Sequence, residues 1–415
     1  MPAPESRLQH GREKRRAASR TQLGEFDVLK RRFKPIDVLL ASAAGRIPKL
    51  LPIKYGRMAK SPFAFFRGAV SIMAADLASE PHTGIFVQLC GDAHLQNLGC
   101  YEAPDGRLVF DINDFDETIP GPWEWDVKRM AASIALAGPR AAVEAFASSY
   151  CATIRSLAAQ PVLVYARHQI HRVNKTQAVS AAIQQAQRAN PCDLLSKYTD
   201  GAGRFKKIKH TLRRLEGEER SEVLASLPLY RQSLAPERLH LFQFFRPLDV
   251  AFKLVGTGSV GLRDYVVLMQ GNGADDPLFL QIKQEGESAY APYLKAARYP
   301  NQGRRVAEGQ RKVQPVSDLL LGWTRIGEYD YAVRQLNDHK GGVDLTQLKA
   351  DGLNGLALVA GELLARGHAR SGDPLSIRAY IGSGDKVAKA IVRYGLEYAS
   401  VAEADFELFT SVIGE

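Results

Sequence analysis

The chain has 415 residues, of which 45% are hydrophobic and 24% charged, and this composition excludes a globally disordered protein. The length exceeds the usual span of one hydrophobic core, so we expect two lobes. The formal net charge of +10 favours polyanionic ligands in general, among them nucleotides, nucleic acid and anionic membrane surfaces.

Cysteine usage and hydropathy bear on the compartment. The four cysteines follow no zinc-ligand spacing, and so few in a long chain make no disulfide framework. No apolar run approaches the roughly 18 residues of a membrane helix, and no apolar segment of signal type follows the basic N-terminus. We therefore expect a cytoplasmic protein without a membrane span.

The first 30 residues are strongly basic. Only Glu5 and Glu13 offset the local positive charge, which comes from Arg7, Arg12, Lys14, Arg15, Arg16 and Arg20. Charge runs of this kind are usually solvated. We therefore expect residues 1–30 to form a mobile basic tail.

Residues 31–246 are expected to form the first part of a larger lobe. A Pro-containing loop and an apolar helical run occupy 50–78, and two predicted strands follow at 84–89 (GIFVQL) and 107–113 (RLVFDIN). A helix is predicted from Val127, with Gly138-Pro139 as its stop. Residues 140–245 are predicted to be mostly helical. The basic stretch at 203–220, GRFKKIKHTLRRLEGEER, is expected to be a solvated helix face.

The pattern of residues changes near Val250. Short β-like runs separated by glycine residues predict a small β-rich lobe over 247–342. The last segment, 343–415, returns to helix and to the larger lobe. The helical period there is kept by Leu353, Leu356, Ala357, Ala360 and Leu364.

Acidic and polar side chains gather around the two predicted strands. The sequence CGDAHLQNLG at 90–99 holds Asp92, His94 and Asn97, and FDINDFDET at 110–118 adds Asp111, Asp114, Asp116 and Glu117. If the two strands pair as neighbours, Asp92, Asn97 and Asp114 come together at one edge. Hard oxygen ligands of this kind suit Mg²⁺, although Asp and Asn are also ordinary turn residues and His94 is equally explained as a buried hydrogen-bonding side chain.

A glycine-rich loop lies in the predicted small lobe. The stretch VGTGSVGLRDYVVLMQG at 255–271 contains Gly256, Gly258, Ser259 and Gly261. A strand follows the loop, where a dinucleotide fold would have a helix, and the next strand ends on Lys283. Protein kinases use this arrangement to cover ATP phosphates and neutralise them. On a predicted helix over 303–314, Glu308 is a candidate partner of Lys283, with Glu287 as its competitor.

The pattern GD-H-x-x-N, followed by an apolar strand and DFD, resembles the catalytic loop and metal-binding aspartate of aminoglycoside and choline phosphotransferases, which belong to the kinase-like superfamily. This resemblance implies that Asp92 is the base or hydroxyl-orienting residue. It also implies that Asn97 is a metal ligand and Asp114 the principal metal aspartate. In GPWEWDVKRMAAS at 121–133, Asp126 would anchor the catalytic loop.

The order of the motifs differs from that of kinases, because here the catalytic-loop motif precedes the glycine loop. A circular permutation reconciles the two. The helix-like segment ELLARGHARSGD at 362–373 supports it, because this helix would normally run into the catalytic loop. His368, Arg370 and Asp373 are then expected near the site, although a helix cap explains Asp373 almost as well. Arg57 and Arg67 are further candidates, either for binding an anion or for fixing their own loop.

Seven blocks of the sequence together resemble the bacterial family called domain of unknown function 2252, from about Arg31 onward. The blocks are LLPIKYGRMAKSPFAFFRG, CGDAHLQNLG, DINDFDETIPGPWEWDVKRMAAS, VGTGSVGLRDYVVL, FLQIK, VRQLNDHKG and LARGHARSGD. The family name implies no established reaction, and a kinship with kinase-like folds is an analogy.

These observations favour an α+β, two-lobed, protein-kinase-like fold with circularly permuted motif order. The expected function is an ATP- and Mg²⁺-dependent transfer of the γ-phosphoryl group to a hydroxyl of a small-molecule or protein acceptor. The alternatives are AMP transfer on the same fold and a nucleotide-binding regulatory module without transfer activity. A nucleic-acid-binding role rests only on net charge and the basic tail.

Overall fold

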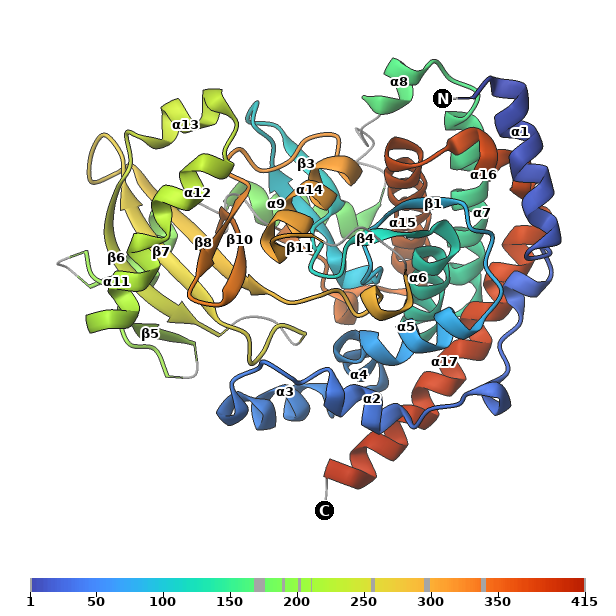
Figure 1. Ribbon diagram of the computed structural model, residues 1–415, viewed down its shortest axis with the longest axis horizontal. Coiled ribbons are helices and arrows are strands. Elements are labelled where there is room, and N and C mark those ends of the chain that lie inside the picture. The colour runs from blue at the N-terminus through green and yellow to red at the C-terminus, as the bar shows by residue number, and fades with distance from the viewer. Residues whose placement is uncertain are drawn as a thin grey trace.

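The computed structural model describes residues 2–167, 176–188, 191–200, 203–209, 211–254, 258–294, 299–336 and 341–413. These residues form a mixed α+β protein, as the sequence predicts. Figure 1 shows a β-rich lobe on the left and long helices on the right. None of the described helices combines the length and the apolarity needed to cross a membrane.

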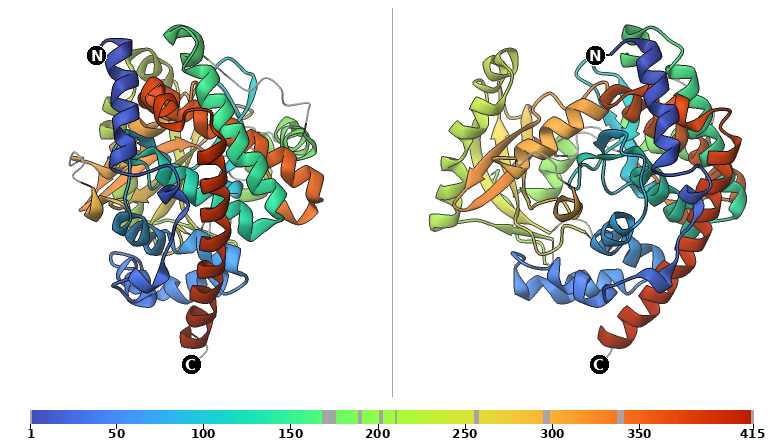
Figure 2. Two further views of the ribbon diagram at one scale, coloured as in Figure 1. Left: turned by 90° about the vertical axis from the view of Figure 1, so that its right-hand side faces the viewer. Right: turned by 45° about the vertical axis from the view of Figure 1, so that its right-hand side comes forward.

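Four long helices form the centre of the helical lobe: α6 (Trp123–Ala137), α7 (Arg140–Leu157), α15 (Ala350–Ser371) and α17 (Asp385–Ile413). Helix α15 lies along α7, and α17 packs on α6 and α7 (Figures 1 and 2). The approach of α15 to α7 requires glycine, because a Cβ on Gly361 would lie 2.6 Å from the backbone oxygen of Phe146. The two predicted helical periods thus belong to helices that pack in one core.

The two predicted strands both form, but they do not pair with each other. Each has a different antiparallel partner, because β2 and β3 are joined through the short segment 103–107 and make a local hairpin. This pairing keeps the two polar loops together, since the Asn113 N–H donates to the Asn97 carbonyl over 2.8 Å. The strands are β1 (Phe86–Leu89) with β4 (Ile119–Pro122), and β2 (Leu98–Glu102) with β3 (Leu108–Ile112) and β11 (Gly341–Gly342).

A six-stranded antiparallel sheet forms the β-rich lobe, in the order β5-β6-β7-β8-β10-β9. Helix α14 (Gln302–Val313) connects β8 to β9 and packs on β9 and β10. Alternation of side chains along the strands separates two faces. Three short helices, α11 (Gly217–Ala225), α12 (Leu227–Ser233) and α13 (Pro236–Phe242), cover the outer one. The strands are β5 (Leu212–Arg214), β6 (Arg246–Lys253), β7 (Asp264–Gln270), β8 (Pro277–Glu285), β9 (Gly322–Ile326) and β10 (Tyr329–Gln335).

The segment between α7 and the sheet differs from its prediction. Residues 203–220 do not form a charged helix: most of the described part is irregular backbone with isolated bridges and β5, and only its end enters α11 (Gly217–Ala225). Residues 212–245 pack on the sheet rather than on the larger lobe, because Val223, Tyr230 and Phe242 supply the apolar cover of its outer face. The helices are α8 (Val162–Ala166), α9 (Gln177–Arg188), α10 (Pro191–Tyr198), α11 (Gly217–Ala225), α12 (Leu227–Ser233) and α13 (Pro236–Phe242).

The N-terminal segment also differs from its prediction, because its basic residues form contacts within the molecule. Helix α1 (Pro4–Glu13) packs on α16 (Pro374–Ile381), as Figures 1 and 2 show. The Arg7 guanidinium binds the Asp373 carboxylate with a shortest distance of 2.6 Å. The side chains of Arg15 and Arg20 donate to carbonyl groups at the end of α16.

The segment after this tail runs beneath both lobes in Figure 1. It begins with α2 (Pro35–Ala41). Over 50–78, where the sequence predicts a loop and one helical run, it forms three helices: α3 (Leu51–Met58), α4 (Pro62–Gly68) and α5 (Val70–Ser79). Proline at the first or second position of α2, α3 and α4 is compatible with helix, because the first N–H groups of a helix need no intrahelical partner.

Candidate active site

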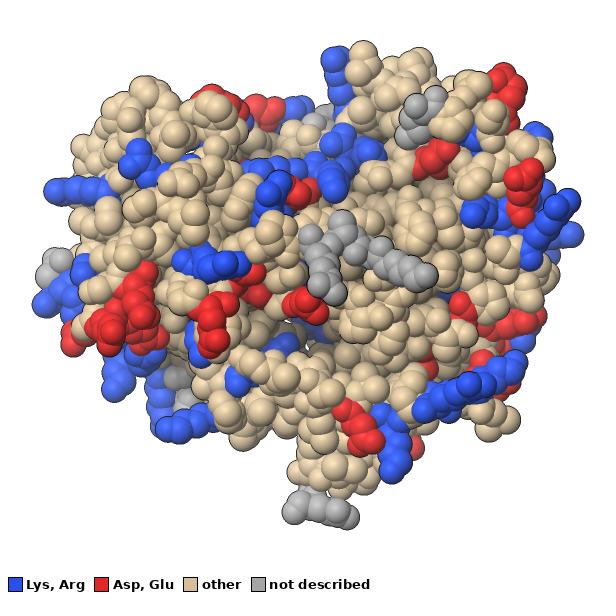
Figure 3. Space-filling view, in the orientation of Figure 1, with Lys and Arg blue, Asp and Glu red and all other residues tan. Residues whose placement is uncertain are grey.

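A cleft of about 590 Å³ lies where three parts of the chain meet. The loops at 90–99 and 113–118 line one side with Asp92, His94, Asp114, Asp116 and Glu117. The glycine loop and the segment after β8 line a second side, and the segment from α2 to α5 lines the third. Figure 3 shows the molecule hollowed between the lobes, with acidic and basic side chains near the opening.

The 90–99 loop is held by the start of α6. Asp126, which the sequence predicts as its anchor, accepts hydrogen bonds from the N–H groups of Cys90 (2.8 Å) and Gly91 (3.0 Å). Gly91 has φ +88°, and a Cβ there would lie 2.2 Å from the Glu117 carbonyl oxygen. Only glycine therefore allows the two polar loops to approach this closely. Asn97 closes the turn by donating from Nδ2 to the Asp92 carbonyl over 2.6 Å.

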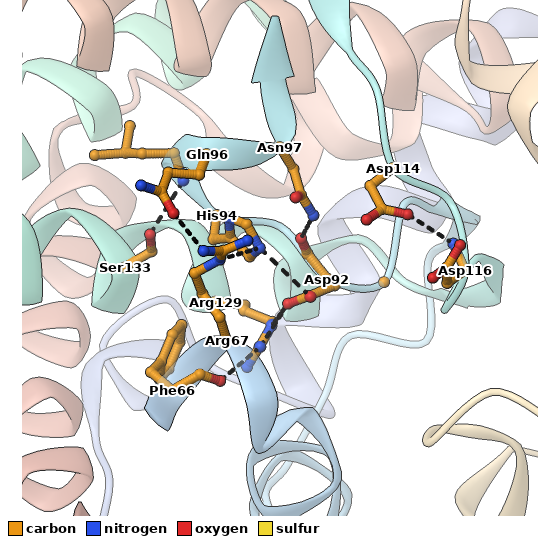
Figure 4. Close-up of polar contacts among 12 residues, drawn as sticks. Phe66, Arg67, Asp92, His94, Gln96, Asn97, Asp114, Asp116, Arg129 and Ser133 are labelled. Atoms are coloured by element: carbon orange, nitrogen blue, oxygen red, sulfur yellow. Dashed lines mark hydrogen bonds and ion pairs between the residues drawn. The ribbon is translucent and has the colours of Figure 1, made fainter. Parts of the chain in front are cut away.

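Asp92 is held in place by a buried cation. The Arg129 guanidinium donates to Asp92 Oδ1 from Nε (2.8 Å) and from Nη2 (2.5 Å), while His94 Nε2 lies 3.5 Å from Oδ2 (Figure 4). Burial opposes ionisation of Asp92, but the charge of Arg129 and the contact with His94 outweigh it and hold the pKa below its usual value. The Asp92 side chain remains 19% exposed. Asp92 is thus a fixed carboxylate that faces the cleft.

His94 is buried beside this carboxylate. Its Nε2 lies 3.2 Å from Arg67 Nε. Burial lowers the pKa of His94, and the positive charges of Arg67 and Arg129 also lower it, whereas the negative charge of Asp92 raises it. The His94 ring and Arg67 both line the cleft.

Lys283 reaches the acidic loop from the sheet. Its ammonium group pairs with Asp116 Oδ2, which also accepts from Ser259 Oγ over 3.3 Å. Burial alone would lower the pKa of Lys283, but Asp116 and Asp114 raise it above its ordinary value. Lys283 also pulls the pKa of Asp114 below its ordinary value against the cost of burial. Burial and the charge of Asp114 raise the pKa of Asp116 despite its pairing with Lys283.

The glycine loop connects β6 to β7 and is covered by the segment before α3. Gly258 and Ser259 line the cleft, and Gly261 has φ +97°, a conformation that favours glycine. Arg46 donates from Nη1 to the carbonyl groups of Gly258 (2.8 Å) and Val260 (2.7 Å). Gly256, which the sequence predicts as part of this loop, lies outside the described residues.

The predicted ion pair between Lys283 and Glu308 is replaced by another arrangement. Glu308 faces the outside of α14 and binds Arg304 over 2.7 Å, so the partner of Lys283 is Asp116. The inner face of α14 presents Arg305, which donates to the carbonyl groups of Asp116 (2.7 Å), Thr118 (2.6 Å) and Gly286 (2.9 Å). Glu287, the competing candidate, lines the cleft without pairing with Lys283.

Four further predicted residues have different positions. Arg67 lines the cleft, whereas Arg57 is half-buried on α3 and outside the cleft lining. His368 lies behind the 90–99 loop, with Nε2 3.4 Å from Asp126 Oδ2 and Nδ1 2.8 Å from the Tyr150 hydroxyl. Asp373 caps α16 and binds Arg7, so its contacts are with the N-terminal helix and not with the cleft.

Sequence reasoning missed three basic residues of this region: Lys54, Arg129 and Arg305. A signal existed for Arg129, because a helix places it on the face of Asp126 and Ser133, at spacings of three and four. Both neighbours bind the 90–99 loop, Ser133 through the N–H of Leu95 over 3.1 Å. For Lys54 and Arg305 we find no comparable local signal, because the groups they face are distant in the chain.

Among the described residues, no group of three or more His, Cys, Asp or Glu side chains forms a metal site. Mg²⁺ does not require such a group, since it often takes one or two protein oxygens and completes its shell with waters and phosphate oxygens. Asp114 and Asn97 line a second cavity of about 240 Å³, which shares Asp114 and Arg67 with the cleft. The Asp114 carboxylate and the Asn97 amide are ligand types that this ion accepts.

No curated protein and no solved structure matches the chain. A family model described as an uncharacterized protein conserved in bacteria (DUF2252) matches residues 46–412. This match covers the glycine loop, the lysine strand and both polar loops. The chain therefore belongs to the DUF2252 family of bacterial proteins.

Proposed function

We propose that the protein is an ATP- and Mg²⁺-dependent phosphotransferase with a circularly permuted, kinase-like fold, which moves the γ-phosphoryl group to a hydroxyl group of an acceptor. One observation carries the proposal: Asp92, Asp114, Asp116 and the glycine loop line one cleft, although they come from distant segments. Lys283 joins them through Asp116, 167 positions away in the sequence. Phosphoryl transfer depends on such a convergence of cation, carboxylates and glycine loop.

The order of elements in the sheet supports the same proposal. The glycine loop joins β6 to β7, the lysine is on β8 beside β7, and α14 follows. Protein kinases place a glycine loop, a lysine strand and a helix in this order. After β10 the chain reaches β11, which pairs with β2 next to the 90–99 loop. A permuted chain would enter the larger lobe at this point.

The charges in the cleft suggest a role for each residue. Asp114 and Asn97 would hold Mg²⁺, which neutralises charge on the phosphates when it is bound. Lys283 would neutralise phosphate oxygens. Asp92 has a depressed pKa and stays ionised, so it would orient the acceptor hydroxyl and accept its proton late. Such a weak base is adequate where the transition state is loose and little deprotonation precedes transfer.

Labelled nucleotide tests this proposal and separates its alternatives. Purified protein, Mg²⁺ and γ-labelled or α-labelled ATP are incubated in two series. One series contains a fractionated metabolite extract as the source of acceptors, and the other contains no acceptor besides the protein itself. Transfer of the γ label, lost in Asp114→Asn and on chelation of Mg²⁺, supports phosphotransfer. Transfer of the α label instead supports AMP transfer, and ATP binding without transfer supports a regulatory module. Absence of any ATP binding would overturn the proposal.

A further inference from the structure

Charge is distributed unevenly around the cleft. The loops at 90–99 and 113–118 and the end of β8 contribute carboxylates, namely Asp92, Asp114, Asp116, Glu117 and Glu285. The wall made by the segment from α2 to α5 contributes cations and no carboxylate: Arg46, Lys54 and Arg67. One side of the cleft therefore suits a metal ion and the other suits an anion.

Two of the three cations on this wall already have partners. Arg46 binds the carbonyl groups of the glycine loop, and Arg67 contacts His94 over 3.2 Å and the side-chain oxygen of Gln96. Each of these contacts fixes the position of a guanidinium group at the cleft. They also hold the tip of the glycine loop beside the wall.

Lys54 differs from both arginines. It is only 1% exposed, and its ammonium group has no hydrogen bond or ion pair within the part of the chain that the structure describes. Burial, reinforced by the charge of Arg46, lowers its pKa to about 7 despite the opposing effect of Glu117. Lys54 lines the cleft, so its ammonium group meets the cleft while the rest of the side chain is buried. A poorly hydrated ammonium without a partner is costly, and a bound anion would offset this cost.

The position of Lys54 indicates whether the anion belongs to the nucleotide or to the acceptor. Its wall contacts the tip of the glycine loop through Arg46, and it meets the 90–99 loop through Arg67 and His94. Asp92, which would orient the acceptor hydroxyl, lies in the same 90–99 loop. The wall therefore lies on the acceptor side of the cleft, which it lines together with Asp92 and Asp114.

We propose that Lys54, flanked by Arg46 and Arg67, binds an oxyanion group of the acceptor, so that the substrate is a hydroxyl compound that carries a phosphate or carboxylate. The identification of this ligand as the acceptor rests on the proposed phosphotransferase function. The existence of the anion site itself does not.

Calorimetric titration of the full-length protein with inorganic phosphate tests the site. Phosphate is titrated in the absence of nucleotide and again with saturating Mg²⁺ and a non-hydrolysable ATP analogue. The variants are Lys54→Met, Lys54→Gln and the conservative Lys54→Arg, with the exposed Lys60→Met of the same segment as matched control. We expect Lys54→Met and Lys54→Gln to weaken phosphate binding about 10-fold or more, while Lys54→Arg and Lys60→Met stay within about threefold.

The two titrations distinguish the sources of the anion. Phosphate that still binds beside the ATP analogue occupies the acceptor side, as proposed, whereas phosphate displaced by the analogue occupies the nucleotide's own phosphate position and overturns the assignment. Equal phosphate affinity in the parent, Lys54→Met and Lys54→Gln overturns the site. If the analogue itself does not bind but phosphate binding depends on Lys54, the phosphotransferase proposal fails and the anion site stands.

Discussion

Asp92 and Asp114 differ in their surroundings, and this difference separates their expected roles. Asp92 is paired with the buried Arg129, whereas the cation that acts most strongly on Asp114 is Lys283, which binds Asp116. We expect Asp114→Asn to abolish Mg²⁺-dependent nucleotide binding, because the amide keeps the shape but loses the charge that a hard cation needs. Nucleotide affinity measured with and without Mg²⁺ checks this.

Asp92→Asn should spare nucleotide binding and lower turnover by about 10²-fold or more, because orienting the acceptor hydroxyl matters chiefly in the reaction itself. Turnover with γ-labelled ATP and nucleotide affinity are measured on the same preparation. Should both Asp92→Asn and Asp114→Asn match the parent in Mg²⁺-dependent nucleotide chemistry, the two polar loops have a structural role only.

Lys283 pairs with Asp116 of the acidic loop. Lys283→Ala removes the partner of Asp116 and leaves two neighbouring half-buried carboxylates, Asp114 and Asp116, without its charge. We expect nucleotide affinity to fall about 10-fold or more, since a phosphate-facing cation is lost. Lys312→Ala on α14 serves as a comparison, because its ammonium group contacts Gln88 rather than a carboxylate of the acidic loop. Unchanged affinity and turnover in a folded Lys283→Ala protein would remove Lys283 from the site.

Lys54 also makes a prediction about stability and pH. The pKa of Lys54 is about 7 in the folded protein, below its value in the unfolded chain. Between these two pKa values the unfolded chain binds more protons than the folded protein. Lys54 therefore lowers the free energy of unfolding most at and below pH 7. Lys54→Met should therefore unfold at a higher temperature than the parent at pH 6.5. The gain should shrink as pH rises toward 10. A gain that grows with pH would contradict the assigned direction.

At the scale of elements, α14 connects the sheet to the acidic loop through Arg305 rather than through Glu308. Arg305 is fully buried and holds three backbone carbonyl groups. We expect Arg305→Met to destabilise the protein by about 2–4 kcal/mol, because these acceptors lose their donor, and to weaken nucleotide binding. Glu308→Gln should change neither, because its pairing with Arg304 is partly exposed. Chemical denaturation and nucleotide titration of both variants make the comparison.

Local sequence patterns predict where helices and strands form better than they predict which strands pair. Periodicity identifies β7, β8, α6 and α15, because alternation and the 3.6-residue repeat depend on neighbours in the chain. The partner of β1 depends on which strand the rest of the fold brings beside it, and that strand is β4 rather than β3. The covering of the glycine loop by Arg46 is likewise a contact between remote segments.

At the scale of the whole molecule, the N-terminal helix is part of the packed structure. Removing residues 2–20 deletes α1, the Arg7–Asp373 pair and the contacts of Arg15 with α16. We expect a lower melting temperature and unchanged DNA affinity over a salt series, because three of the six basic side chains, Arg7, Arg15 and Arg20, bind groups within the protein. A fall in DNA affinity, with a weaker salt dependence, would instead support a nucleic-acid role for this segment.

The docking of α1 should also respond to acid. The pKa of Asp373 is depressed: burial opposes ionisation, but the hydrogen bonds from Arg7 and Ser376 outweigh it. Its contribution to stability is present above the unfolded pKa of about 3.9 and is lost as pH falls through the depressed folded value. Proteolysis of the N-terminal segment should therefore accelerate below about pH 4 in the parent. Asp373→Asn should show that acceleration already at neutral pH.

The sequence by itself identified the mixed α+β class, the glycine loop, the lysine strand and the acidic residues of both polar loops. These features follow from side-chain chemistry and short-range periodicity, which any segment carries wherever it lies in the fold. Only the tertiary structure decided that Lys283 binds Asp116 and not Glu308, that Arg129 holds Asp92, and that Lys54 is buried at the cleft. The reason is physical: an ion pair depends on distance in space, and the packing of segments far apart in the chain sets that distance.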